Sequence, residues 1–194
     1  RSALAVMTEK TKLLLDYGIM ADHAPGFPMH VPPKEVDGVV LTHGHLDHSG
    51  AVPIFHIQEK IPVFGTRLTF EFAQLLISDF IHLSGYYLPF EYLELRSMMR
   101  STVHLGYRQK QAVGDMQLQL LDAGHLPGSA QALIEADGKR LVYTSDFNTI
   151  NTRLLNSSDK DYGLIDAFVI ESTYADEEHP ERLALEREFV EKVT

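Results

Sequence analysis

Four side chains able to bind a metal ion lie within six consecutive residues, His43-Gly44-His45-Leu46-Asp47-His48. They follow the apolar run 36–42, which has the composition of a β-strand. A strand that ends in a turn here would aim the first two histidines at one ion and leave Asp47 and His48 free for a second ion. Imidazole nitrogen and carboxylate oxygen are the ligands expected of Zn²⁺ or a similar divalent metal. The alternative, a histidine-rich surface loop, accounts poorly for this spacing at a strand end.

Three more acidic or imidazole side chains lie at the ends of predicted strands. His125 follows the run 116–121, and Asp146 and Glu171 end two later runs. Taken singly, each has an ordinary interpretation as a loop histidine, a turn aspartate or a strand cap. Because all three, like the cluster at 43–48, lie at the end of a predicted strand, we interpret them as parts of the same site.

The composition is that of a soluble globular domain. At 194 residues, with 44% hydrophobic and 23% charged residues, the chain is one domain by length. It contains no cysteine, so disulfides and thiolate metal sites are excluded and any metal must be held by nitrogen and oxygen. We expect a cytoplasmic location on this basis. No apolar run is long enough to span a bilayer, and we expect no membrane association.

The formal net charge is −10. That charge argues against broad, nonspecific electrostatic binding of nucleic acid by this segment. It does not exclude an enzyme that acts on nucleic acid, because metal-binding carboxylates add to the negative count and bound cations offset them.

Hydrophobic periodicity predicts strands and helices that are interleaved along the chain. The predicted strands are 2–7, 12–16, 36–42, 61–65, 103–105, 116–121, 133–136, 140–144 and 167–170, and the predicted helices are 49–57, 67–82, 90–99 and 181–193. Asp137-Gly138 is suited to the positive φ angles of a tight hairpin turn. Strands interleaved with helices predict a layered α/β architecture.

The ligand pattern resembles the metallo-β-lactamase fold and, more narrowly, the β-CASP nucleases. These include ribonuclease J and the archaeal and eukaryotic mRNA 3′-end cleavage factors. Leu15-Asp16-Tyr17-Gly18 is similar to the first motif of the family and 43–48 to the second. His125 and Asp146 match the third and fourth motifs. The segment 124–130 is most similar to the archaeal cleavage-factor branch.

A further match separates the β-CASP nucleases from lactamases, glyoxalases and flavodiiron proteins. Glu171-Ser172-Thr173-Tyr174 looks like the acidic motif that opens the β-CASP insertion. The resemblance therefore implies an α/β fold of the metallo-β-lactamase αββα sandwich type. It also implies that the sandwich is incomplete, with residues 1–175 forming the N-terminal part of the lactamase domain and 176–194 the start of the insertion.

The resemblance implies a zinc site residue by residue. The predicted metal ligands are His43, His45 and His125 for the first zinc, Asp47 and His48 for the second, and Asp146 as a bridge. A hydroxide between the two ions would attack the phosphodiester. Asp47 and Glu171 are the predicted catalytic residues, the second of which would orient a histidine or water in proton transfer. Asp16 would support the site without touching the metal.

In the family, the rest of the β-CASP insertion and the C-terminal completion of the fold follow this point. That later part provides the remaining histidine of the second zinc and the histidine that protonates the leaving group. We therefore interpret the chain as a fragment of a longer nuclease, and expect the isolated segment to be nearly inactive.

The leading functional hypothesis is a metal-dependent hydrolase: a zinc-dependent ribonuclease of mRNA 3′-end cleavage or of RNA maturation and decay. Its partner would be RNA, cleaved endonucleolytically and, as in some family members, also from the 5′ end; a homodimer is left open. The alternative is a hydrolase of a small ester or thioester, which would need a compact single domain. A noncatalytic scaffold is disfavoured because the ligand set is intact.

The remaining histidines carry weaker predictions. His23 and His30 lie in the Pro-, Gly- and His-rich loop 22–33, where they could line the mouth of the metal site. The others are expected to be packed or on the surface: His56, His82, His104 and, in a linker, His179.

Overall fold

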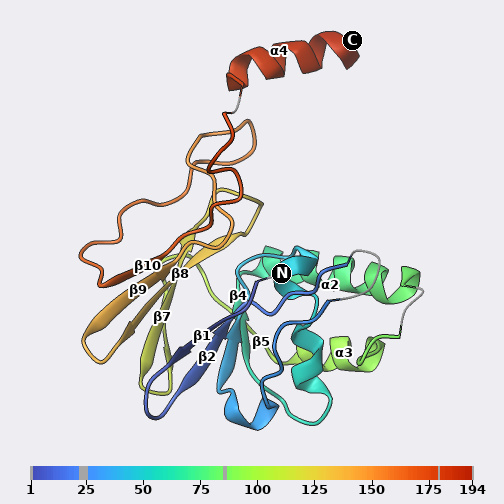
Figure 1. Cartoon of the computed structure of the whole chain (residues 1–194), viewed down its shortest axis with the longest axis vertical. Coiled ribbons are helices and arrows are strands. Elements are labelled where there is room, and N and C mark those ends of the chain that lie inside the picture. The colour runs from blue at the N-terminus through green and yellow to red at the C-terminus, as the bar shows by residue number, and fades with distance from the viewer. Residues whose placement is uncertain (1, 22–25, 85–86, 179, 194) are drawn as a thin grey trace.

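The computed structural model describes residues 2–21, 26–84, 87–178 and 180–193. Two five-stranded sheets face each other, and helices cover the outer face of one of them (Figure 1). The elements, in chain order, are β1 (Leu4–Met7), β2 (Lys12–Leu15), η1 (Pro33–Glu35), β3 (Gly38–Val40), α1 (Leu46–Ser49), η2 (Val52–His56), β4 (Val63–Gly65), α2 (Arg67–Leu83), α3 (Tyr92–Arg100), β5 (Thr102–His104), β6 (Lys110–Val113), β7 (Met116–Asp122), β8 (Ala130–Ala136), β9 (Lys139–Tyr143), β10 (Ala167–Val169) and α4 (Arg182–Val193).

The first sheet has the order β1-β2-β3-β4-β5, and β2 to β5 run parallel. Parallel strands need crossover connections, which here contain α1 with η2 and then α2 with α3. Buried apolar residues of the sheet, such as Val39 and Val63, pack with Phe70 and Ile77 of α2 and Met98 of α3. The carboxyl ends of β2 and β3 therefore lie at the same edge, where Asp16 and His43 follow them.

The second sheet has the order β10-β9-β8-β7-β6 and is antiparallel except for β10, which runs parallel to β9. Asp137 and Gly138 join β8 to β9 with φ angles of 51° and 69°, as the predicted tight hairpin requires. Side chains of both sheets form one buried cluster between them, including Leu15 and Phe64 from the first sheet and Leu118 and Ile134 from the second.

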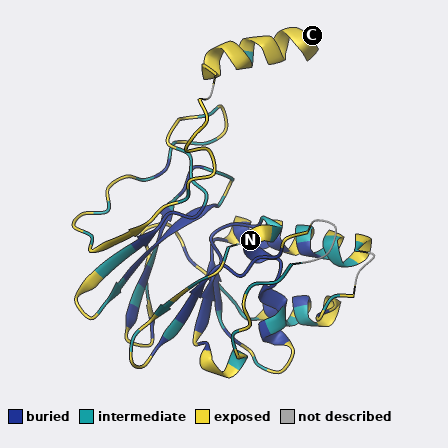
Figure 2. Ribbon diagram, in the orientation of Figure 1, coloured by how far each residue is buried: buried dark blue, intermediate teal, exposed yellow. Residues whose placement is uncertain are grey.

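The outer face of the second sheet is covered by the segment 147–166 rather than by a helix. Tyr162 and Ile165 pack there against Leu121, Leu133 and Val142. Helix α4 projects away from the sheets (Figures 1 and 2), and none of its described residues is buried. Among the described elements, the αββα sandwich thus has one of its two helical layers, which agrees with the predicted incomplete sandwich.

Most predicted elements form within three residues of their predicted bounds, but one predicted helix was wrong and one strand was not predicted. Instead of one helix over 49–57, the chain forms α1 and then the 3-10 helix η2. Pro53 has no N–H to donate and the N–H of Ala51 bonds to Tyr17, so the turns cannot join into one α-helix. Strand β6 was missed because its sequence, Lys-Gln-Ala-Val, lacks a clear alternation.

The predicted amphipathic helix over 181–193 forms as α4, but its apolar side chains are exposed. No helix in the described part of the chain has the length and apolar character needed to cross a bilayer.

His56, at the end of η2, is buried without a hydrogen-bond partner. Its side chain is 4% exposed, and neither ring nitrogen is bonded within the described residues. Burial lowers the pKa of His56 to about 4, because the protein interior disfavours the charged imidazolium.

This burial predicts a component of acid sensitivity. In the unfolded chain a histidine has a pKa of about 6.5. As the pH falls from 6.5 towards 4, the unfolded state binds a proton that native His56 does not, so stability is lost in that window. Lowering the pH from 7 to 5 reduces the unfolding free energy of the wild type. The same change should reduce that of His56→Leu by about 2 kcal/mol less.

Urea unfolding at the two pH values measures this difference. His82→Leu is the matched control for a histidine-to-leucine change, because His82 is exposed on α2. Equal pH dependence of His56→Leu and the wild type would contradict the prediction.

Candidate metal centre

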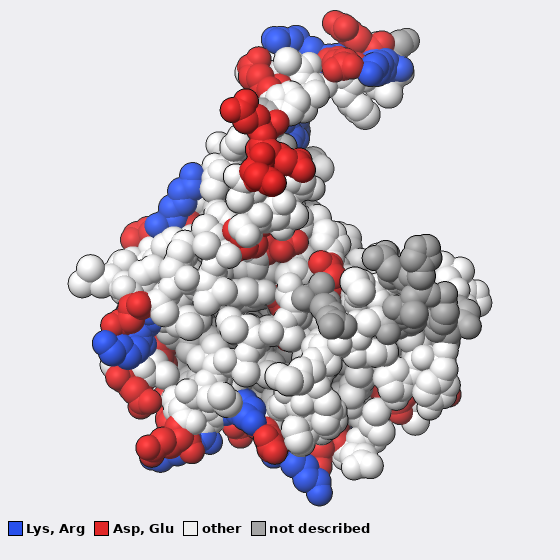
Figure 3. All heavy atoms as spheres, viewed as in Figure 1, with Lys and Arg blue, Asp and Glu red and all other residues white. Residues whose placement is uncertain are grey.

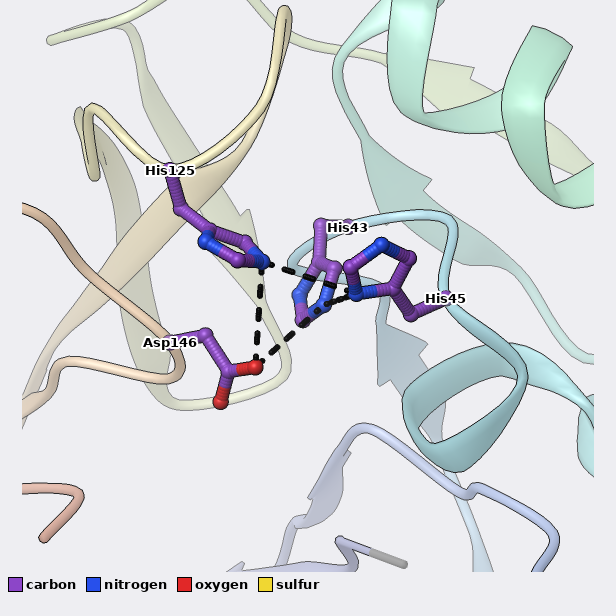
Figure 4. A group of neighbouring side chains, drawn as sticks. All are labelled: His43, His45, His125 and Asp146. Carbon is purple, nitrogen blue, oxygen red and sulfur yellow. Dashed lines mark hydrogen bonds and ion pairs between the residues drawn. The ribbon is translucent and has the colours of Figure 1, made fainter. Parts of the chain in front are cut away.

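Four potential metal ligands from both sheets point toward one another (Figure 4). They are Nε2 of His43, Nδ1 of His45, Nε2 of His125 and Oδ2 of Asp146. His43 Nε2 lies 3.1 Å from His45 Nδ1, and His125 Nε2 lies 3.5 Å from the same atom. Asp146 Oδ2 lies 3.8 Å from both His43 Nε2 and His125 Nε2.

These separations suit a tetrahedral divalent ion. Bonds of about 2.0–2.1 Å from zinc to nitrogen or oxygen place tetrahedral ligand atoms about 3.3 Å apart. All four atoms lie within 4.8 Å of one another, and three imidazoles with one carboxylate form a nitrogen- and oxygen-rich set appropriate to zinc. The described residues therefore fit a metal ion at this point.

A second set of donors adjoins the first through Asp146. Its other oxygen, Oδ1, lies 3.4 Å from His48 Nε2, and that nitrogen lies 3.7 Å from Asp47 Oδ2. One oxygen of this carboxylate thus faces the nitrogens of His43 and His125, and the other faces the single nitrogen of His48. Asp47 is the most exposed donor, with 52% of its side chain accessible, whereas His48 is 2% exposed.

Asp16 is a fully buried carboxylate behind the donors. It accepts a hydrogen bond from His48 Nδ1 at 2.8 Å. The backbone N–H and the hydroxyl of Thr42 both donate to Oδ1 at 2.9 Å, and Tyr143 donates to Oδ2 at 3.2 Å. Because Nδ1 of His48 is held in this way, Nε2 is the nitrogen that faces Asp47 and Asp146.

Two residues of this region have backbone conformations that L-residues rarely adopt. Asp16 has a φ of 59° and Ser145 a φ of 52°. Their side chains meet, with Ser145 Oγ 3.5 Å from Asp16 Oδ2 and 2.7 Å from Thr42 Oγ1. The turns that end β2 and β9 are therefore held in strained conformations at the point where the donors converge.

The chain around His43 and His45 is tightly packed. His45 precedes α1, and the hydroxyl of Ser49 in that helix donates to the Gly44 carbonyl at 3.0 Å. A side chain at position 44 would collide with Phe72 of α2, so glycine is required there. The histidines on either side are consequently fixed between α1 and α2.

Charge and burial affect the donors differently. Burial lowers the pKa of His43 to about 3 and also lowers the pKa of His125, which leaves neutral imidazoles with free lone pairs. Burial acts in the same direction on His48, but Asp16 and Asp146 outweigh it and raise the pKa of His48 to about 10. The hydrogen bond with His48 is the main reason that the pKa of Asp146 falls to about 2.

Glu171 lies beside the donors rather than among them. Its carboxylate accepts a hydrogen bond from the Thr173 N–H at 2.8 Å, and its own N–H donates to Thr144 Oγ1. Burial lowers the pKa of His125, and the negative charge of nearby Glu171 opposes this shift to a small extent.

The remaining histidines do not join this cluster where they are described. His30, His82 and His104 are exposed, and His104 lies against Phe70 with ring centroids 5.2 Å apart. His23 and His179 lie outside the described residues.

Three side chains that hold the donors in place were not predicted from the sequence: Thr42, Tyr143 and Ser145. Thr42 and Ser145 directly precede His43 and Asp146, and this adjacency could have indicated that they support the site. Tyr143 gave none, because its contact with Asp16 spans 127 positions of the chain.

The chain belongs to the metallo-beta-lactamase superfamily. The family model matches residues 2–187. A solved structure supports the fold independently: a metallo-beta-lactamase with a HARLDQ motif from Cronobacter sakazakii has a TM-score of 0.52. It is 22% identical and covers 78% of this chain and 62% of its own.

Curated relatives are similar along the whole chain. RNase aCSPSF2 of Saccharolobus solfataricus is 34% identical over 197 residues, and a probable RNase MJ4 of Methanocaldococcus jannaschii is 35% identical over 201. A transcription termination factor FttA of Methanothermobacter thermautotrophicus is 34% identical over 209 residues. All three alignments cover 100% of this chain but only 40%, 47% and 33% of the relatives, so the chain spans less than half their length.

The buried pair of Asp16 and His48 predicts a stability effect. Asp16→Asn would leave the His48 imidazolium buried without its main counter-charge. We expect the metal-free protein to lose about 3 kcal/mol or more of unfolding free energy. Asp47→Asn, at a side chain that is 52% exposed, should cost less than about 1 kcal/mol.

Urea unfolding in the presence of a chelator tests this contrast. Equal losses for the two variants would show that the buried pair is not an important contribution to stability.

Proposed function

We propose that this chain carries the two-metal centre of a zinc-dependent ribonuclease. The observation that carries the proposal is the position of Asp146, whose Oδ2 faces His43 and His125 while Oδ1 faces His48. One carboxylate between two groups of donors is the arrangement expected of a ligand that bridges two ions.

In this proposal the first zinc would be held by His43, His45, His125 and Asp146. The second would be held by Asp47, His48 and the shared Asp146. Two such ions would lower the pKa of a water and neutralise negative charge on phosphoryl oxygens.

The chain's own residues would prepare this site. Asp16 fixes the ring orientation of His48 through the hydrogen bond to Nδ1. Glu171, next to His125, is proposed to orient a histidine or water that transfers a proton. Asp47, at the exposed side of the centre, would be the donor nearest an incoming substrate.

RNA is the proposed substrate because relatives named as RNases match the whole chain at 34% and 35% identity. The alternative, a small ester or thioester, is less well supported by an open site in which His125 and Asp146 are 28% and 30% exposed, since small-molecule sites usually enclose their ligand. We also propose that residues 1–175 belong to the lactamase domain and 176–194 begin a β-CASP insertion.

The charge of the surface restricts how RNA would be held. In the view of Figure 3, acidic side chains gather along the segment that leads to α4, which includes Asp176, Glu177 and Glu178. Bound metal cations would offset part of this negative field. We therefore propose that the rest of the longer protein contributes much of the RNA-binding surface.

Loss of a metal ligand should remove activity without unfolding the protein. In the full-length protein, Asp47→Ala and His45→Ala should each leave less than about 1% of the wild-type rate of RNA cleavage. Even partners of metal ligands typically contribute 10–100-fold, and a ligand should contribute more. Cleavage of a labelled RNA is the measurement, with zinc content and circular dichroism measured on the same samples.

Asp79→Ala and His82→Ala are the matched controls, because both side chains are exposed on α2. They should cleave RNA at the wild-type rate. A ligand variant that retained that rate, free of contaminating nuclease, would refute the proposal.

The segment 1–194 alone should hold its two metal ions unequally. The first group contains three imidazoles, whereas the second contains His48 and Asp47 with the shared Asp146. Purified by itself, the segment should retain fewer than two zinc ions per chain after dialysis and show weak nuclease activity. Exposed apolar side chains such as Phe168 and Phe189 should also make it associate.

Zinc analysis and analytical ultracentrifugation measure these properties. A monodisperse monomer with two firmly held zinc ions and full activity would show that no further part of the protein is needed.

A further inference from the structure

Two threonine hydroxyls at the start of α2 bind the loop that carries His125. Thr66 follows β4, and Thr69 lies in the first turn of α2. Thr66 Oγ1 donates to the Gly128 carbonyl at 2.7 Å, and Thr69 Oγ1 donates to the same oxygen at 2.9 Å. Both threonines are buried, at 9% and 1% exposure. Two buried donors on one loop carbonyl form a strong local attachment.

The loop fits closely against the start of α2. Gly128 has a φ of 86°, and a Cβ there would lie 2.6 Å from Leu68 Cβ and 2.7 Å from Thr66 Oγ1. Any other residue at position 128 would push the loop away from the helix. Close packing and the two hydrogen bonds therefore define the position of the Gly128 carbonyl.

The attachment continues to His125 through a hydrogen-bonded turn. Ser129 Oγ accepts hydrogen bonds from the backbone N–H groups of His125 and Leu126 at 3.2 and 3.1 Å. The N–H of Ser129 donates to the Leu126 carbonyl at 3.0 Å. Because these bonds close the turn, a shift at Gly128 would also move His125.

The position of this loop determines whether the donors can meet. His125 follows β7 of the second sheet, whereas His43 and His45 follow β3 of the first. His125 Nε2 lies 3.5 Å from His45 Nδ1, close to the separation of about 3.3 Å in a tetrahedral site. A displacement between the sheets would therefore move His125 away from the other two imidazoles.

We propose that Thr66 and Thr69 are positioning residues that hold His125 against the first sheet at the separation required for metal binding. This inference rests on the proposed metal centre. The threonines touch neither the donors' nitrogen atoms nor a substrate, and they act through the loop 125–129.

Thr69→Val tests the inference most cleanly, since it keeps the shape of the side chain and removes the hydroxyl. Thr66 is less suitable because its Oγ1 also caps α2 by accepting from the Thr69 N–H. In the full-length protein, competition with a chelator should show zinc affinity at the first site reduced about tenfold or more. Thr69→Ser, which restores the hydroxyl, should recover most of the affinity.

Thr102→Val is the matched control. Thr102 lies in β5 of the first sheet, and its hydroxyl donates to the Met99 carbonyl at 3.0 Å, away from the loop. This variant should bind zinc as the wild type does. If Thr69→Val is too unstable to purify, Ser129→Ala is the alternative. It removes the hydroxyl that accepts hydrogen bonds from the N–H groups of His125 and Leu126, and it should lower zinc affinity in the same way.

Combining Thr69→Val with His125→Ala distinguishes an effect on the position of His125 from a general effect on the structure. When His125 is already replaced in His125→Ala, adding Thr69→Val should cause no further loss of zinc affinity. An equal further loss would overturn the inference. Wild-type protein that binds no zinc would refute the metal centre and the inference together, whereas normal zinc binding by Thr69→Val would refute the inference alone.

Discussion

The candidate metal donors follow strands of two different sheets, so the packing of one sheet on the other determines whether a metal centre can form. Apolar burial between the sheets, from residues such as Leu15 and Leu118, provides most of the attraction but little directional control. Directed bonds across the gap fix the alignment. The N–H of Ala130 donates to the Thr42 carbonyl at 2.8 Å, next to the Gly128 carbonyl and its two threonine donors.

Asp16 extends this constraint to the second group of donors. A fully buried carboxylate is unfavourable unless it is paired and hydrogen-bonded. Here it is surrounded by donors from both sheets: Thr42 and His48 from the first, and Tyr143 and Ser145 from the second. The unusual φ angles of Asp16 and Ser145 allow these groups to meet. The buried charge therefore links the alignment of the sheets to the orientation of His48.

The sequence indicated which candidate donors could lie together, because residue types able to bind a metal and their spacing are local features of the chain. The spacing from His43 to His48 and the strand-end positions of His125 and Asp146 were enough to anticipate one cluster, and the structure brings these side chains together. The break between α1 and η2 was harder to predict, because it depends on a tertiary bond from the Ala51 N–H to Tyr17 as well as on Pro53.

The contacts that support the site were largely invisible in the sequence. Thr66 and Thr69 look like ordinary residues at the start of a helix, and their partner is a backbone carbonyl about 60 positions further along the chain. A carbonyl has no sequence signature. Likewise, β6 is short and polar, and forms because β7 offers it a partner rather than because of its own pattern.

We propose that Asp146 lies between two metal ions. Anomalous diffraction at the zinc edge from crystals of the zinc-loaded full-length protein tests it most directly. We predict two peaks about 3.5–4 Å apart, one among His43, His45 and His125 and the other beside Asp47 and His48, with one oxygen of Asp146 toward each. A single peak, or zinc bound away from Asp146, would contradict the account.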